Sequence, residues 1–117
     1  MSVAERLARL KKARAAAIAV RDEMNRGNDN DPSPSNVLKR APILRRAEAE
    51  LTDLDLMIND LEGDAQPIQL DADQIAKLDS LAERLDEEIA RDALVDVALD
   101  TATRVLGAVT EVRGILA

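Results

Sequence analysis

The chain is 117 residues long, which is enough for a single domain with a modest hydrophobic core. It contains no Cys and no His, and this excludes disulfides, zinc sites built from Cys and His, and nucleophilic catalysis by Ser-His-Asp or Cys-His arrangements. It has a net charge of −7 and no Phe, Tyr or Trp, so its core must be built from aliphatic residues and alanine, which favour closely packed helices.

The first predicted helix covers residues 3–26. Ser2 and Glu5 form a capping box at its start, and Gly27 stands where a helix commonly ends. Apolar residues recur along it at the spacing of one helical face. The apolar run at residues 15–20 is too short for a signal peptide, and no other stretch is apolar enough to cross a membrane, so the sequence favours a cytoplasmic protein.

Residues 27–36 are all turn or cap formers and include two prolines, which predicts an exposed connection between two helices. The Asn and Asp residues in this segment suggest calcium by composition only. An EF-hand loop needs a glycine at its sixth position and a distal glutamate, and this segment lacks both. A flexible turn without a metal is therefore the favoured interpretation.

The second predicted helix covers residues 37–62 and ends at Gly63. From Leu44 its apolar residues alternate at steps of three and four, which is the heptad pattern of helices that pack as in a coiled coil. Pro42 lies inside this segment and cannot donate a backbone hydrogen bond, so two interpretations remain open: the helix starts near Pro42, or it starts earlier and is kinked there. Two helices joined by a connection of this length fold back antiparallel.

The third predicted helix is the longest and covers residues 72–115. Asp71 and Gln74 form a capping box at its start, and no proline, and no glycine before Gly107, interrupts it. At 1.5 Å per residue it would be roughly 65 Å long, about twice the length that either earlier segment could cover. The predicted fold class is therefore all-α: a single domain, residues 1–117, folded as an antiparallel three-helix bundle with an extra-long third helix.

The C-terminal half of this third helix is apolar over about 200° of its circumference, twice the width of a stripe that packs on one side. A helix of this kind is usually buried on two sides, and a second copy of the chain is the simplest cover, because most soluble oligomers are symmetric homo-oligomers. The sequence therefore predicts a homo-oligomer, in the simplest case a dimer. Its predicted seam consists of Leu94, Val95, Ala98, Leu99, Ala102, Val105, Leu106, Val109, Val112 and Leu116.

Charge is divided unevenly along the chain. Residues 1–46 hold eleven Lys and Arg against five Asp and Glu, whereas residues 47–117 hold five against eighteen. The first interpretation is internal, with a basic first helix lying against acidic later ones. The second is a surface for nucleic-acid phosphates, although the chain is acidic overall and lacks aromatic residues for stacking. The residues that would make such contacts are Arg6, Arg9, Lys12, Arg45 and Arg46.

Carboxylates gather on the second and third predicted helices. Four of them brought together between the helices could hold Mg²⁺, as in all-α nucleotide pyrophosphohydrolases. Such spacings also arise by chance in a chain with twenty-three acidic residues, and a solvated helix face has the same appearance. The residues concerned are Glu48, Glu50, Asp53, Glu83, Asp86 and Glu87.

These patterns favour a non-catalytic function. We expect a helical interaction module of the adaptor, secretion chaperone or inhibitor type, which homo-oligomerises and binds a protein partner without a cofactor and without a membrane. One alternative is a nucleic-acid-associated regulator that uses the basic N-terminal half. A third possibility is a Mg²⁺-dependent all-α hydrolase.

Overall fold

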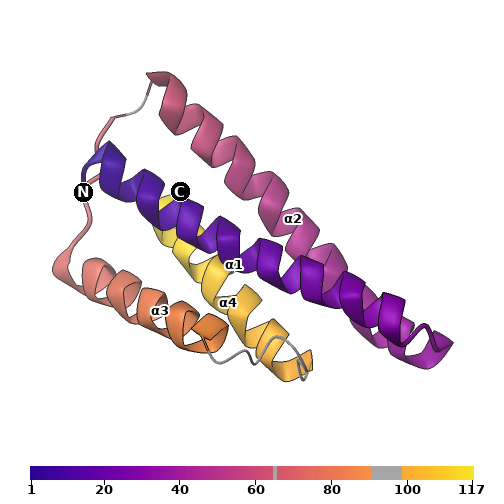
Figure 1. Cartoon of the computed structure of the whole chain (residues 1–117). Coiled ribbons are helices and arrows are strands. Elements are labelled where there is room, and N and C mark those ends of the chain that lie inside the picture. The colour runs from indigo at the N-terminus through magenta and orange to yellow at the C-terminus, as the bar shows by residue number, and fades with distance from the viewer. Residues whose placement is uncertain (65, 91–98) are drawn as a thin grey trace.

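The computed structural model describes residues 1–64, 66–90 and 99–117, and within these ranges the chain forms four α-helices and no strand (Figure 1). The helices are α1 (Val3–Asn30), α2 (Pro34–Asp64), α3 (Ala72–Ala90) and α4 (Leu99–Leu116). The all-α prediction is confirmed, whereas the prediction of three helices is wrong. None of the helices in the described ranges combines the length and the apolar character needed to cross a bilayer.

Side chains cap the helices where the sequence predicts it. The Ser2 hydroxyl accepts a hydrogen bond from the backbone N–H of Glu5 at 3.1 Å at the start of α1. At the start of α3 the capping box is reciprocal: the Asp71 carboxylate accepts from the N–H of Gln74 at 2.8 Å, and the Gln74 side chain accepts from the N–H of Asp71 at 3.0 Å. These bonds satisfy backbone donors that have no partner within the helix.

The connection between α1 and α2 is shorter than predicted, because only residues 31–33 lie between the two helices. The backbone N–H of Asp31 donates to the carbonyl oxygen of Gly27 at 2.8 Å, so helical hydrogen bonding continues past the glycine. The carbonyl oxygen of Ser33 accepts from two N–H groups in the first turn of α2, at 3.1 and 3.0 Å. The predicted connection over residues 27–36 is therefore wrong in length, since residue types alone do not show that backbone bonds extend through them.

Arg40 of α2 holds the end of α1 in place. Its guanidinium donates to the side-chain oxygen of Asn28 at 3.3 Å and to the carbonyl oxygen of Asp31 at 3.0 Å. It lies so close to Gly27 that a Cβ atom there would be 2.7 Å from Arg40 Nε. A hydrogen bond from the Asn36 side chain at 2.6 Å lowers the pKa of the Asp31 carboxyl below its ordinary value. This end of the hairpin is thus fixed by polar contacts rather than by apolar burial.

The helix α2 passes through Pro42, which answers the question that the sequence leaves open. The helix begins at Pro34, eight residues earlier. Pro42 cannot donate to the carbonyl oxygen of Leu38, four positions before it. The side chain of Leu38 is 72% exposed, so water can reach this part of the helix and replace the missing donor.

The predicted single helix over residues 72–115 is wrong, because α4 folds back antiparallel to α3 (Figure 1). Ion pairs join the two helices in antiparallel register, Lys77 with Glu111 at 4.0 Å and Arg104 with Glu88 at 3.7 Å. A helix of roughly 65 Å would exceed the 48 Å long axis of the molecule and leave its apolar second half uncovered. Burial of that half against the same chain is the physical reason for the fourth helix.

The four helices alternate in direction, and α1 and α4 form the central pair. Both contact all the other helices, whereas α2 and α3 do not contact each other within the described residues (Figure 1). Alanines let the central helices approach closely, since α1 buries three of them completely. They are Ala13, Ala16 and Ala17. The outcome is that α2 and α3 lie on the outside of the bundle, each with one side open.

Candidate interaction surface

Most of the described residues of the predicted oligomer seam lie in the interior of the chain. The side chains of six of them are at most 4% exposed in the single chain. These are Ala102, Val105, Leu106, Val109, Val112 and Leu116. Leu99 is half-buried against the same core. The excess of apolar surface that motivated the seam is therefore covered by α1, α2 and α3, and no argument for a seam on α4 remains at these positions.

Three residues of the predicted seam, Leu94, Val95 and Ala98, lie outside the described residues.

Basic residues of α1 lie against acidic residues of α3. Arg9 forms an ion pair with Asp79, and its guanidinium also donates to the carbonyl oxygen of Leu78 at 3.4 Å. Lys12 pairs with Asp86 at 2.7 Å. These two candidates for nucleic-acid contacts are thus used in the charge match inside the bundle.

The remaining candidates for nucleic-acid contacts lie on α1 and α2. The guanidinium of Arg6 donates to the carbonyl oxygen of Leu116 at 2.8 Å, at the end of α4. Arg46 donates to the hydroxyl of Thr110 at 3.3 Å. Arg45 is exposed on α2. Three of the five residues therefore lie on α1 and two on α2.

The two acidic clusters are not brought together, because α2 and α3 do not contact each other in the part of the chain that the structure describes. Asp86 is occupied by Lys12, and Asp53 lies 3.8 Å from the Arg113 guanidinium. In the same described part, no three acidic side chains are placed to hold a metal ion. Of the other four members, three are exposed, namely Glu48 on α2 and Glu83 and Glu87 on α3.

Glu50 is the one buried carboxylate among the residues whose burial the structure describes, and it joins α2 to α4. Arg113 donates two hydrogen bonds to it, at 2.6 and 3.2 Å, and the hydroxyl of Thr110 donates a third at 2.7 Å. Burial alone would raise the pKa of Glu50, but the hydrogen bonds from Arg113 and Thr110 outweigh it and lower the pKa. The bond to Glu50 in turn raises the pKa of the Arg113 guanidinium. Both groups are therefore charged, and Glu50 serves packing rather than metal binding.

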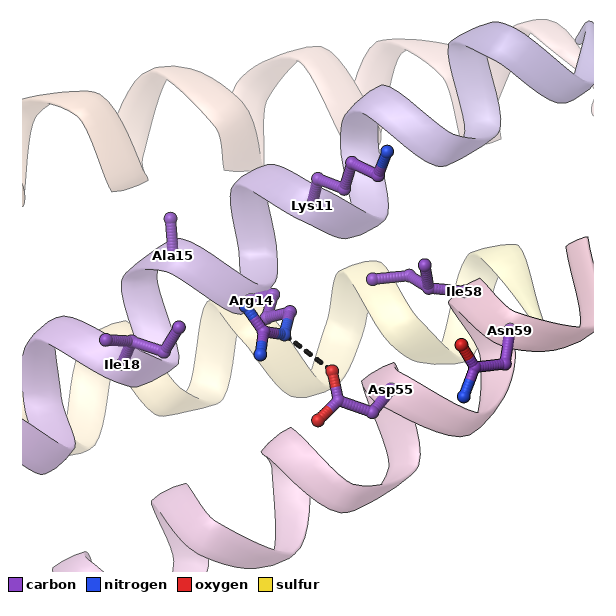
Figure 2. Close-up of a pocket in the computed structure, with 7 residues that line it drawn as sticks. All are labelled: Lys11, Arg14, Ala15, Ile18, Asp55, Ile58 and Asn59. Carbon is purple, nitrogen blue, oxygen red and sulfur yellow. Dashed lines mark hydrogen bonds and ion pairs between the residues drawn. The ribbon is translucent and has the colours of Figure 1, made fainter. Parts of the chain in front are cut away.

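A groove of about 520 Å³ lies between α1 and α2 (Figure 2). Ala15 and Ile18 of α1 and Ile58 of α2 supply its apolar surface. Arg14 bridges it, since its Nε atom lies 2.5 Å from a carboxylate oxygen of Asp55 on the opposite side. The groove combines apolar residues with charged ones, and an amphipathic helix can bind to such a surface.

A second recess of about 510 Å³ lies at the end of the molecule where the two termini meet. Met57 and Leu61 of α2 and Ile68 of the connection to α3 line it. The N-terminal amine donates to the carbonyl oxygen of Ile68 at 2.9 Å at this end. The chain's own ends therefore participate in this recess.

Sequence reasoning missed the groove between α1 and α2, although its charges follow a readable pattern. Glu48, Asp55 and Glu62 are seven residues apart on α2, so they lie along one side of that helix. On α1, Lys11 and Arg14 are three apart and also share one side. The pattern could have predicted an acidic edge and a basic edge, but only the fold shows that they face each other.

Comparison with known proteins adds no identification: no protein-family model, no curated protein and no solved structure matches the chain.

Proposed function

We propose that this chain is a non-catalytic helical interaction module that binds a protein partner through the open side of the α1–α2 hairpin. The observation that supports it is the groove between the two longest helices, which α3 and α4 leave uncovered. The bundle places α2 on the outside, in contact with α1 and α4 alone among the described helices. The adaptor, chaperone and inhibitor classes all require such a face.

The exposed apolar residues of α2 also support the proposal that a partner binds on the α2 side of the molecule. Leu38 and Leu56 are 72% and 60% exposed, which makes them the two most exposed large apolar residues among those described. A single exposed leucine is ordinary on a protein surface. Both lie on α2, the helix that also supplies one wall of the groove, and they add exposed apolar surface for an amphipathic partner of that helix.

The charge pairs of α1 make the nucleic-acid alternative the weaker one. Arg9 and Lys12 are engaged by Asp79 and Asp86, so phosphate binding by these residues would have to break pairs within the bundle. Arg45 and Arg46 remain exposed, and two exposed cations make a small contribution to phosphate binding.

The proposal is tested by blocking the groove with one bulky side chain. Ala15 is exposed and lines the groove, so Ala15→Arg fills it without changing the core. Ala76→Arg is the matched control, because Ala76 is also exposed on a helix but lies on α3. Both variants and the parent chain are used as baits for affinity capture from the native host, after circular dichroism has shown equal helicity.

We expect a partner that the parent chain and Ala76→Arg retain and that Ala15→Arg loses. Equal recovery of every captured protein by the two variants would place the binding surface elsewhere and contradict the proposal.

A further inference from the structure

The groove between α1 and α2 has one basic edge and one acidic edge. Lys11 and Arg14 stand on the α1 side, and Asp55 and Glu62 stand on the α2 side. Arg14 lies across from Asp55 at 2.5 Å, and Lys11 lies across from Glu62 at 3.5 Å. Each cation therefore has its anion at the same height along the groove (Figure 2 shows the Arg14–Asp55 bridge).

These four side chains remain accessible to a second molecule. Their exposed fractions are 58% for Lys11, 42% for Arg14, 50% for Asp55 and 52% for Glu62. An arginine has five N–H donors and a lysine three, so one contact within the chain leaves donors for another. The edges can thus form ion pairs across an interface without first breaking the pairs within the chain.

The direction of a two-fold axis between two copies of the chain determines which charged edges face each other. Rotation about an axis parallel to the groove exchanges left and right but keeps the height along the groove, so the basic edge of one copy faces the acidic edge of the other. Arg14 then lies over Asp55 of the second copy, and Lys11 lies over Glu62. Rotation about the perpendicular axis in the same plane would place like charges over each other, which is strongly unfavourable.

We infer that a second copy of this chain docks on the α1–α2 groove, related to the first by a two-fold axis parallel to the groove. This inference rests on the proposed function and names its partner. It replaces the predicted seam on α4 with a surface on α1 and α2. A two-fold interface must be self-complementary, and the opposed edges provide that complementarity.

The size of the face is sufficient for a stable pair. With 28 residues, α1 is about 42 Å long, and two helices side by side are about 20 Å wide, so the face offers roughly 800 Å² per copy. Standard protein interfaces bury about this area on each partner. Ala15, Ile18 and Ile58 would supply the apolar contacts, and the Arg14–Asp55 and Lys11–Glu62 pairs would supply the polar ones.

The test uses a charge-swapped variant that exchanges the two edges. It carries Lys11→Glu, Arg14→Asp, Asp55→Arg and Glu62→Lys, so the pairs within the chain and the net charge are both preserved. The masses of the parent and swapped chains are measured by analytical ultracentrifugation from about 1 to about 500 μM, the range in which interfaces of this size at the weak end associate. Mixing the two chains, each with a different fluorophore, then measures mixed dimers by energy transfer.

We expect each chain to dimerise with itself and the mixture to give no mixed dimer, because in a mixed pair Arg14 would face an arginine. The single variant Arg14→Asp is expected to weaken the parent dimer by at least about tenfold, since the contact occurs twice in a two-fold pair.

A parent chain that stays monomeric over the whole range overturns the inference, and so do mixed dimers that form as readily as the pure ones. The proposed function is tested independently of this inference, by the capture experiment. If the chain is monomeric and Ala15→Arg loses a captured partner, the proposed interaction module stands and the docking of a second copy is refuted. A second copy of the chain captured in an Ala15-dependent manner supports both.

Discussion

At the scale of single residues, the contact between Gly27 and Arg40 shows how a local preference can be reversed by a neighbour. Alanine is favoured over glycine inside a helix by up to about 1 kcal/mol. A Cβ at Gly27 would lie 2.7 Å from Arg40 Nε, so the arginine would have to leave Asn28 and Asp31. We predict that Gly27→Ala lowers the free energy of unfolding by about 1 kcal/mol, measured by urea denaturation.

The control for Gly27→Ala is the same substitution in an Arg40→Ala background. Arg40→Ala removes the three atoms nearest to the added methyl group, so the helix preference should prevail and Gly27→Ala should stabilise that background by about 0.5 kcal/mol. An equal effect of Gly27→Ala in both backgrounds would show that the close approach has no energetic consequence.

Glu50 and Arg113 are the buried ion pair between α2 and α4. Removing the charge with Glu50→Gln takes away the hydrogen-bonded counter-ion of the partly buried Arg113 guanidinium and leaves it only the exposed Asp53 carboxylate, 3.8 Å away. We predict a loss of about 2 kcal/mol in the free energy of unfolding at pH 7. Glu48→Gln, at an exposed position on the same helix, should change it by less than about 0.5 kcal/mol.

The pH dependence of this pair follows from the lowered pKa of Glu50. A carboxyl whose pKa is lower in the folded than in the unfolded chain stabilises the fold fully above its ordinary value of 4.5, and this stabilisation is lost as the pH falls through the folded value. The difference in unfolding free energy between the parent and Glu50→Gln should therefore be constant from about pH 5.5 to about pH 8 and decrease below about pH 4.5. A difference that stays unchanged down to about pH 3 would refute the assignment of a stabilising ionised Glu50.

At the scale of helices, the sequence predicts the two capped starts but not the features that depend on residues far apart in the chain. The caps at Ser2 and Asp71 are found where the pattern places them, because capping depends on residues three apart in the chain. The end of α1 beyond Gly27 depends instead on Arg40, thirteen residues later, and the return of α4 onto α3 depends on burial against α1 and α2. Neither is a local property of the sequence, so neither could be predicted from it.

The helix α4 contains two glycines with no packing role. An added Cβ at Gly107 or Gly114 would meet no atom within 4 Å, in contrast to Gly27. Because alanine is the better helix former, we predict that Gly107→Ala and Gly114→Ala each raise the free energy of unfolding by about 0.5–1 kcal/mol. Thermal unfolding followed by circular dichroism checks this, and a destabilising effect at either position would mean that α4 packs differently at that glycine.

At the scale of the whole molecule, the uneven charge and the broad apolar face of the last helix are both visible in the sequence. The charge division predicts the internal match that the structure shows between Lys12 and Asp86. The sequence predicts that the apolar face at residues such as Val105 and Leu106 is buried on two sides. The structure buries these residues against other helices of the same chain. The length of an apolar helix shows that its apolar face must be buried, but it does not show whether the same chain or a second molecule buries it.

The central claim is that α4 is buried within one chain while the α1–α2 groove is open, and thiol labelling tests it most directly. The chain has no cysteine, so a single one introduced by Val105→Cys or Ala15→Cys reports one site. Val105 is 1% exposed and Ala15 lines the groove. We predict that the thiol of Val105→Cys stays protected from a maleimide reagent at every dilution, and that the thiol of Ala15→Cys reacts quickly in the dilute chain. Labelling of Val105→Cys that appears on dilution, with Ala15→Cys protected throughout, would contradict the claim and restore a seam on α4.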